Sequence, residues 1–171
     1  MIELPEYARV VRTLNSGEHP YCSLLPRISE SPAVRRIATP AIPLQIILKT
    51  ARVRIEKGEG FVRVDDQMPA IVLMEDYYLR GNDLDLYLDL LHELTHLRQL
   101  AEGQILWDKR FSYVDRITEI EGYAVAIEEG VRLGMSKSDV IRHLSNPWMT
   151  RDDVRRLLEN VHRFLADNKE M

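Results

Sequence analysis

Two histidines and a glutamate in the middle of the chain have the residue types and spacing of a metal-dependent hydrolase. In the run His92-Glu93-Leu94-Thr95-His96 the two imidazoles stand at positions i and i+4, which share one face of a helix about one turn apart. Imidazoles placed in this way can hold one zinc ion, with Zn–N distances near ~2.0–2.1 Å. Glu93 cannot reach the same metal face, but it can take a proton from a water beside the metal. The motif therefore predicts one zinc ion per chain and Glu93 as the catalytic base.

A long helix is expected to carry this motif. The segment from Asp83 to Glu102 contains neither glycine nor proline, and Gly103 follows it directly, as start and stop signals of a helix require. Leucines occupy positions around most of the helix circumference, which is typical of a central buried helix. They include Leu84, Leu88, Leu91 and Leu94.

A catalytic zinc site needs a third protein ligand and one open position. Residues 115–130 supply glutamates on a probable second helix, whose apolar stripe has helical spacing and comprises Ile117, Ile120, Ala124, Ile127 and Val131. At about 100° per residue, Glu121 lies on the flank of that stripe, Glu119 falls nearly opposite it, and Glu128 is on the apolar side two turns further along. We therefore predict Glu121 as the third ligand and keep Glu119 and Glu128 as alternatives.

These residues resemble the gluzincin class of zinc peptidases, whose members include thermolysin, the HtpX-like peptidases and the ImmA/IrrE-type domains. The resemblance covers roughly residues 60–130 and includes Glu121-x-x-Ala124, the context in which several members carry their ligand glutamate. It implies His92, His96 and Glu121 as zinc ligands and Glu93 as the catalytic base. Val125 is a departure, because HtpX-like and ImmA-like sequences often carry Asp or Asn after this alanine.

Composition bounds the class of protein. The chain has 171 residues, 45% of them hydrophobic and 29% charged, as expected of a single soluble globular domain spanning 1–171. The net charge of −4 indicates no nucleic-acid partner, and the apolar runs are too short to cross a membrane. Residues 1–6 lack the basic and apolar regions of a secretory signal. With one cysteine no internal disulfide can form, so we expect a cytoplasmic protein.

The remaining segments give a coarse order of elements. Residues 3–15 read as a short amphipathic helix, and the proline-rich stretch 16–43 as irregular. Residues 44–57 fit a helix or a strand, and we favour the helix. Residues 61–65 and 70–74 alternate or cluster as strands. Because strand 70–75 is nearest in sequence to the zinc helix, we expect it to line a groove for an extended peptide.

The C-terminal part, residues 131–171, has a helix-turn-helix pattern. Helices are expected at 136–144 and 150–165, with Ser136 and Thr150 as N-caps. A DNA-reading module is one alternative, but positive and negative charges are nearly balanced here. We therefore favour a helical hairpin that packs on the peptidase core.

Several other side chains are candidates for roles at the site. Tyr113, Tyr123 and His143 follow the zinc helix and are possible hydrogen-bond donors to a transition-state oxyanion. Cys22 lies in the proline-rich stretch, where its thiolate could act as a latch on the open zinc position. A small, half-buried apolar role is the commoner one for such a cysteine.

The sequence thus predicts an α+β fold with a compact zincin-like core, in which a small sheet packs on the His-Glu helix. The expected function is a zinc-dependent peptidase that acts on a peptide or protein substrate. Two alternatives remain open. One is a regulatory protein on the same fold that binds or cleaves one specific partner, and the other is a non-catalytic zinc-binding scaffold.

Overall fold

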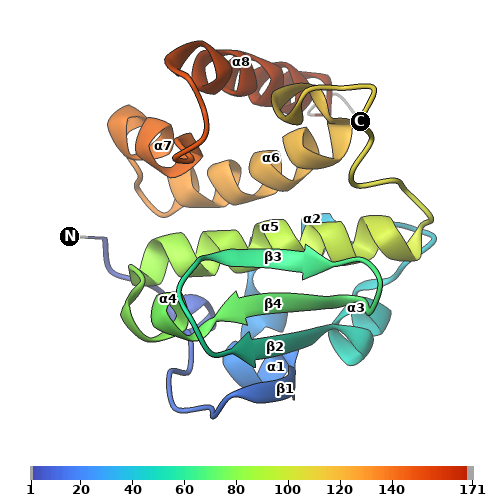
Figure 1. Ribbon diagram of the computed structural model, residues 1–171, viewed down its shortest axis with the longest axis vertical. Helices are drawn as coiled ribbons and strands as arrows, with labels where there is room; N and C mark the ends of the chain where they lie inside the picture. The colour runs from blue at the N-terminus through green and yellow to red at the C-terminus, as the bar shows by residue number, and fades with distance from the viewer. Residues whose placement is uncertain (1, 169–171) are drawn as a thin grey trace.

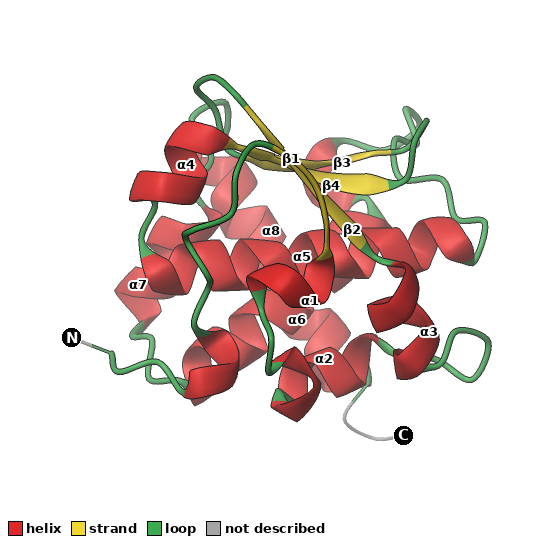
Figure 2. Cartoon of the chain, turned by 90° about the horizontal axis from the view of Figure 1, so that it is seen from below, coloured by secondary structure: helices red, strands yellow, loops and turns green. Residues whose placement is uncertain are grey.

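The computed structural model describes residues 2–168 as a mixed α and β structure, in which a four-stranded sheet packs against a set of helices (Figures 1 and 2). The strand order is β1-β2-β4-β3. The β2–β4 pair is parallel, and the other two pairs are antiparallel. The strands are β1 (Gly17–Pro20), β2 (Arg52–Glu56), β3 (Val62–Asp65) and β4 (Ala70–Met74).

Helices fill most of the remaining chain. The short ones are α1 (Tyr21–Leu24), α2 (Pro32–Ile37), α3 (Leu44–Thr50) and α4 (Glu75–Arg80). The longer set comprises α5 (Asp83–Ala101), α6 (Ile117–Arg132), α7 (Lys137–Leu144) and α8 (Arg151–Asp167). Single 3-10 turns are η1 (Glu6–Ala8), η2 (Ile28–Glu30) and η3 (Tyr113–Asp115). None of the helices in residues 2–168 combines the length and the apolar character needed to cross a membrane.

The sheet buries one face against α5. On β2, Val53 and Ile55 are buried while the residues between and beside them are partly exposed, because successive side chains of a strand point to opposite faces. On the outer face, Arg54 of β2 pairs with Asp65 of β3 at 2.7 Å. β4 lies inside the sheet and β3 at its edge. The strands predicted near 61–65 and 70–74 are confirmed. However, of these two the strand with a free edge is β3, and not β4, which was expected to line a groove for a peptide.

Helix α6 lies between two other layers. Figure 1 shows α5 on one side of it and α8 on the other. For this reason α6 is buried around most of its circumference. The apolar stripe assigned to it was partly wrong, because two of its members, Ile117 and Val131, are 61% and 55% exposed. A helix with contacts on two sides has no single polar face. The sequence argument that put Glu119 on such a face was wrong, because Glu119 is 2% exposed.

The N-terminal third differs from the expectation. Residues 3–15 form only the turn η1, and the stretch 16–43 contains β1, α1 and α2 rather than irregular chain. Two of its prolines stand at the start of a helix instead of interrupting one. Pro32 starts α2, and Pro43 precedes α3, where a missing N–H costs nothing. Residues 44–57 divide into α3 and β2. The favoured helix is therefore confirmed only for the first half, and the alternating pattern of the second half forms a strand.

The two C-terminal helices match the prediction closely. Ser136 and Thr150 cap α7 and α8, each in a reciprocal capping box with an aspartate three residues later. Leu157 and Val161 of α8 are fully buried, and α8 packs on α6. This is the arrangement expected of a hairpin that covers the core.

Candidate metal centre

His92, His96 and Glu119 form one buried cluster. Glu119 Oε2 lies 3.3 Å from His92 Nε2 and 3.6 Å from His96 Nε2, and all three side chains are nearly inaccessible. Three ligands on a tetrahedral zinc with bonds of ~2.0–2.1 Å would be roughly 3.3–3.4 Å apart. Glu119 Oε2 has no hydrogen-bond partner among the described residues, although a buried carboxylate oxygen normally has one. The cluster can therefore hold a metal ion.

The structure places Glu119, not Glu121, beside the two histidines. Residues two apart are separated by about 200° around a helix, so only one of these glutamates can face the imidazoles. Glu119 stands in the first turn of α6 and faces α5 there. Glu121 instead accepts hydrogen bonds from Arg98 and Gln99 near the end of α5. Glu128, the other alternative, forms an ion pair with Arg36.

The charges within the cluster attract one another strongly. Burial alone would lower the pKa of His96, but the carboxylates of Glu119 and Glu93 outweigh it and raise that pKa to about 9. Burial alone would raise the pKa of Glu119, yet the two imidazoles hold it well below its usual value. Without a metal, a proton on His96 can take the place of the cation beside Glu119. A metal ion must displace this proton, so metal affinity will depend on pH.

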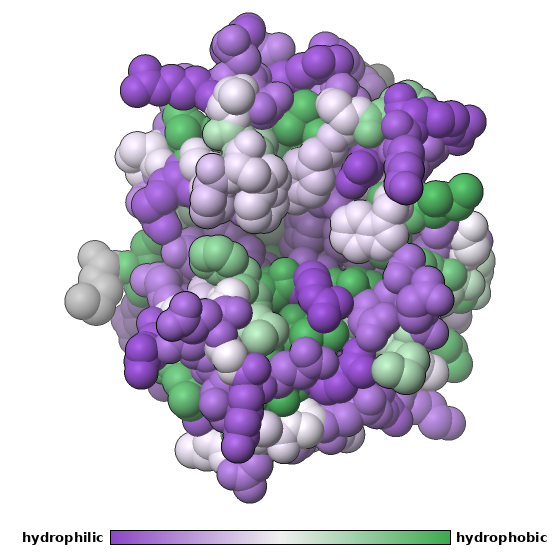
Figure 3. Space-filling model, viewed as in Figure 1, coloured by the Kyte–Doolittle hydropathy of each residue, from purple (hydrophilic) through white to green (hydrophobic). Residues whose placement is uncertain are grey.

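Glu93 borders a cleft beside the cluster. This cleft has a volume of about 290 Å³, and Figure 3 shows a hollow on this face, between the sheet and the C-terminal helices. The Glu93 carboxylate accepts no hydrogen bond from residues 2–168 and is 8% exposed. Burial raises its pKa, although His92 and His96 act in the opposite direction. A carboxylate with a raised pKa beside a cleft has the properties of a general base. The other lining residues include Phe61, Val62, Tyr113, His143 and Trp148.

Two tyrosines and an asparagine form a hydrogen-bonded chain in this cleft. Asn146 Nδ2 donates to the Tyr123 hydroxyl at 2.9 Å, and the hydroxyls of Tyr123 and Tyr113 are 2.9 Å apart. The amide nitrogen can only donate, so Tyr123 accepts from it, whereas either of the two tyrosine hydroxyls can donate to the other. When Tyr123 is the donor, the Tyr113 hydroxyl can give its hydrogen to Glu119 or to a ligand in the cleft.

His143 belongs to a separate buried pair. Its Nδ1 lies 3.1 Å from Asp85 Oδ1, and its Nε2 lies 3.7 Å from Asp89 Oδ1. Burial would lower the pKa of His143, but the two aspartates raise it above its usual value. The contact ties α7 to α5 at one end of the cleft. Its role in the structure is therefore to hold the two helices together.

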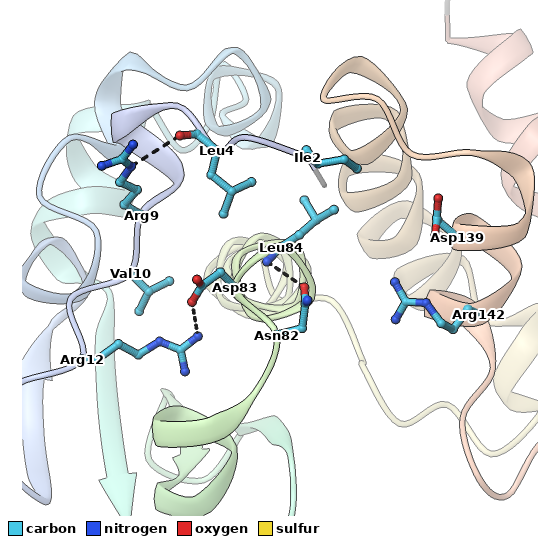
Figure 4. A pocket seen from close by; sticks show the side chains of 10 residues that line it. All are labelled: Ile2, Leu4, Arg9, Val10, Arg12, Asn82, Asp83, Leu84, Asp139 and Arg142. Carbon is cyan, nitrogen blue, oxygen red and sulfur yellow. Dashed lines mark hydrogen bonds and ion pairs between the residues drawn. The ribbon is translucent and has the colours of Figure 1, made fainter.

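Two other features carry no chemistry toward the cluster. A larger cavity of about 810 Å³ lies at the start of α5 (Figure 4), but its polar groups already serve the fold. Asn82 caps α5, and Arg12 pairs with Asp83 at 2.5 Å. Cys22 is half-buried, and its thiol approaches the carbonyl of Leu48 at 3.8 Å. Cys22 is not part of the only metal-binding group found in the described residues, and its partial burial agrees with the small apolar role favoured over the latch.

Comparisons with known proteins place the chain in no family: no protein-family model matches it, and neither does any curated protein or solved structure.

Proposed function

We propose that this protein is a zinc-dependent peptidase in which His92, His96 and Glu119 hold the metal and Glu93 is the general base. The observation that carries the proposal is the position of a free, buried carboxylate at a cleft directly beside a two-histidine, one-glutamate cluster. Zinc, when bound there, would supply Lewis acidity that polarises a carbonyl and makes a nearby water more acidic. Glu93 would take a proton from the attacking water and pass it to the leaving amine.

The number of ligands favours catalysis over a structural role. Structural zinc sites have four protein ligands, whereas catalytic sites keep one position open. Only three ligating side chains converge here among the described residues. Glu121 is held by Arg98 and Gln99, and Cys22 lies elsewhere. The non-catalytic scaffold is therefore the weaker alternative.

Strand β3 supports an extended peptide as the substrate. Met74 N donates to Phe61 O, so Phe61 and Arg63 form hydrogen-bonded pairs with β4, and the backbone groups of Val62 point toward the free edge. Val62 lines the same cleft as His92 and Glu93. A peptide added along this edge would bring its backbone toward the cluster, as in β-strand addition.

Tyr113 would stabilise the transition state in this scheme. As the scissile carbonyl becomes tetrahedral, negative charge develops on its oxygen, and a preorganised hydroxyl donor lowers the energy of that charge. The chain from Asn146 through Tyr123 orients the Tyr113 hydroxyl for this purpose.

The test combines metal content with cleavage. Metal-stripped protein reconstituted with zinc should hold about one ion per chain, and an unstructured, internally quenched peptide library should be cleaved. Cleavage of such peptides would indicate a general peptidase. Zinc without cleavage of any peptide would favour the regulatory alternative, in which one specific partner is the substrate. A protein that binds no zinc would refute the proposal.

A further inference from the structure

Gln99 connects His96 to Glu121, the glutamate that lies outside the metal-binding cluster. Its Oε1 lies 2.8 Å from His96 Nδ1, and its Nε2 donates to Glu121 Oε2 at 2.7 Å and to the carbonyl of Thr118 at 3.1 Å. Gln99 is 0% exposed and His96 2%. These side chains therefore have no water to substitute for a lost partner.

The partners of Gln99 fix the orientation of its amide. A carboxylate oxygen and a backbone carbonyl can only accept hydrogen bonds, so both must face the NH₂ group. The amide oxygen then faces His96 Nδ1, and this nitrogen must carry a hydrogen to donate to it. A neutral His96 held in this way has its lone pair on Nε2. That is the nitrogen 3.6 Å from Glu119 Oε2.

Arg98 binds Glu121 on the side opposite Gln99. Its guanidinium donates to both Glu121 Oε1 and Glu102 Oε2, and the Arg98 side chain is 3% exposed. A guanidinium can only donate hydrogen bonds, so Glu121 Oε1 accepts from Arg98 while its Oε2 accepts from Gln99 Nε2.

We propose that Arg98, Glu121 and Gln99 form a relay that holds His96 in the tautomer able to bind a metal, so that Glu121 is a positioning residue and not a ligand. The inference rests on the proposed metal site. His92 has no equivalent, since its Nδ1 has no hydrogen-bond partner among the described residues. The two histidines of the motif are thus oriented by different means.

The decisive experiment exchanges the side chains of Gln99 and Glu121, first at position 121 alone and then at both positions. In Glu121→Gln, the new amide directs its oxygen to Arg98 and its NH₂ to the NH₂ of Gln99. Rotation of the Gln99 amide relieves this clash at the cost of its bond to the Thr118 carbonyl, and it turns an N–H toward His96 Nδ1, which moves the hydrogen of His96 to Nε2. In the double variant Gln99→Glu/Glu121→Gln, the carboxylate at 99 accepts from both His96 and the new amide. The exchange therefore restores the original direction of the hydrogen bond between His96 and residue 99, while the Thr118 carbonyl loses its donor in the single and the double variant alike.

Two measurements test this relay, one of zinc affinity and one of the tautomer of His96. Zinc affinity, measured by competition with a chromophoric chelator, should fall by roughly 10–100-fold in Glu121→Gln, as for other residues that orient metal ligands, and return to the wild-type range in the double variant. Long-range ¹H–¹⁵N NMR of metal-free protein, at a pH where His96 is neutral, should show hydrogen on Nδ1 in wild type and double variant and on Nε2 in Glu121→Gln.

A matched control is Glu128→Gln, which removes a charge from the same helix and from another arginine pair but should leave both readouts unchanged. Should Glu121→Gln fail to fold, Gln99→Met removes the acceptor while keeping the pair of Arg98 and Glu121, and should weaken zinc binding similarly. An unchanged tautomer, or a double variant as weak as the single one, would overturn the relay. Wild-type protein with hydrogen on Nδ1 but no zinc affinity would leave the relay standing and overturn the proposed function.

Discussion

The imidazole of His92 lies directly against Gly122 of α6, so closely that a β-carbon at this glycine would be 2.9 Å from His92 Nδ1. Contacts of that length are too short for carbon and nitrogen, and the ring of Tyr123 also packs against this imidazole, with the ring centroids 4.3 Å apart. The absence of a side chain at 122 is therefore what leaves space for this ring between α5 and α6.

Replacing Gly122 by alanine should weaken zinc binding by displacing His92. Alanine favours a helix by about 1 kcal/mol over glycine, so a loss of metal affinity without loss of helix content would identify the steric cause. Gly130→Ala is the matched control, because its β-carbon would meet Met135 and Leu88 in the core. That variant should lower the melting temperature and keep zinc affinity. Equal zinc affinity in Gly122→Ala and wild type would contradict the expectation.

Glu93→Gln should retain zinc and lose hydrolysis. The amide preserves the shape of the side chain but cannot accept the proton of the attacking water, and general-base catalysis is typically worth ~10²–10⁴-fold in rate. Elemental analysis and the turnover of a quenched peptide measure the two properties on the same sample. If the variant cleaves as fast as wild type, the mechanism is wrong.

Glu119→Gln should reduce the zinc content of the protein far below one ion per chain after dialysis. The amide removes the only carboxylate that faces His92 and His96 in the described cluster. The double variant His92→Ala/His96→Ala should behave likewise. Retention of zinc by Glu119→Gln would return Glu121 to consideration as the third ligand.

Tyr113→Phe should lower kcat by roughly 10²–10³-fold, the usual cost of removing one oxyanion donor, with little change in KM or zinc content. Asn146→Ala should have a smaller effect, because it only releases the orientation of Tyr123. Progress curves at several peptide concentrations separate kcat from KM. A change confined to KM would mean that Tyr113 binds the substrate without stabilising the transition state.

The pair of His143 and Asp85 should make stability depend on pH. The pKa of His143 is raised above 6.5 in the folded protein, so its contribution is complete below about 6.5 and is lost as the pH rises through the folded-state pKa. Urea unfolding of zinc-loaded protein should therefore show declining stability over this alkaline range. His143→Gln should flatten the decline, whereas His162→Gln, at an exposed position on α8, should not. An identical decline in all three would refute the assignment.

Helix α5, which carries the two histidines, could be predicted because its signals are local. Asn82, which caps α5, and Gly103, which follows it with a positive φ of 78°, bracket a stretch free of helix breakers. The positions of His92 and His96 on one face then follow from helix geometry alone.

The third ligand could not be predicted in the same way. Helical periodicity identifies a buried face only when the helix has one, and α6 packs against α5 and α8 on different sides. Whether Glu119 or Glu121 faces the histidines depends on how α6 is rotated against α5, which is set by contacts distant in sequence, such as Gly122 beneath His92. Similarly, Pro32 signals a break in the chain but not that a helix begins there.

The position of α6 between α5 and α8 has a consequence for assembly of the centre during synthesis. The two histidines leave the ribosome before Glu119, and α8, whose Leu157 and Val161 are buried, follows later still. A nascent chain thus exposes both imidazoles before Glu119 can join them. Metal capture would accordingly be a late event, completed when the last helix closes over the one that carries the glutamate.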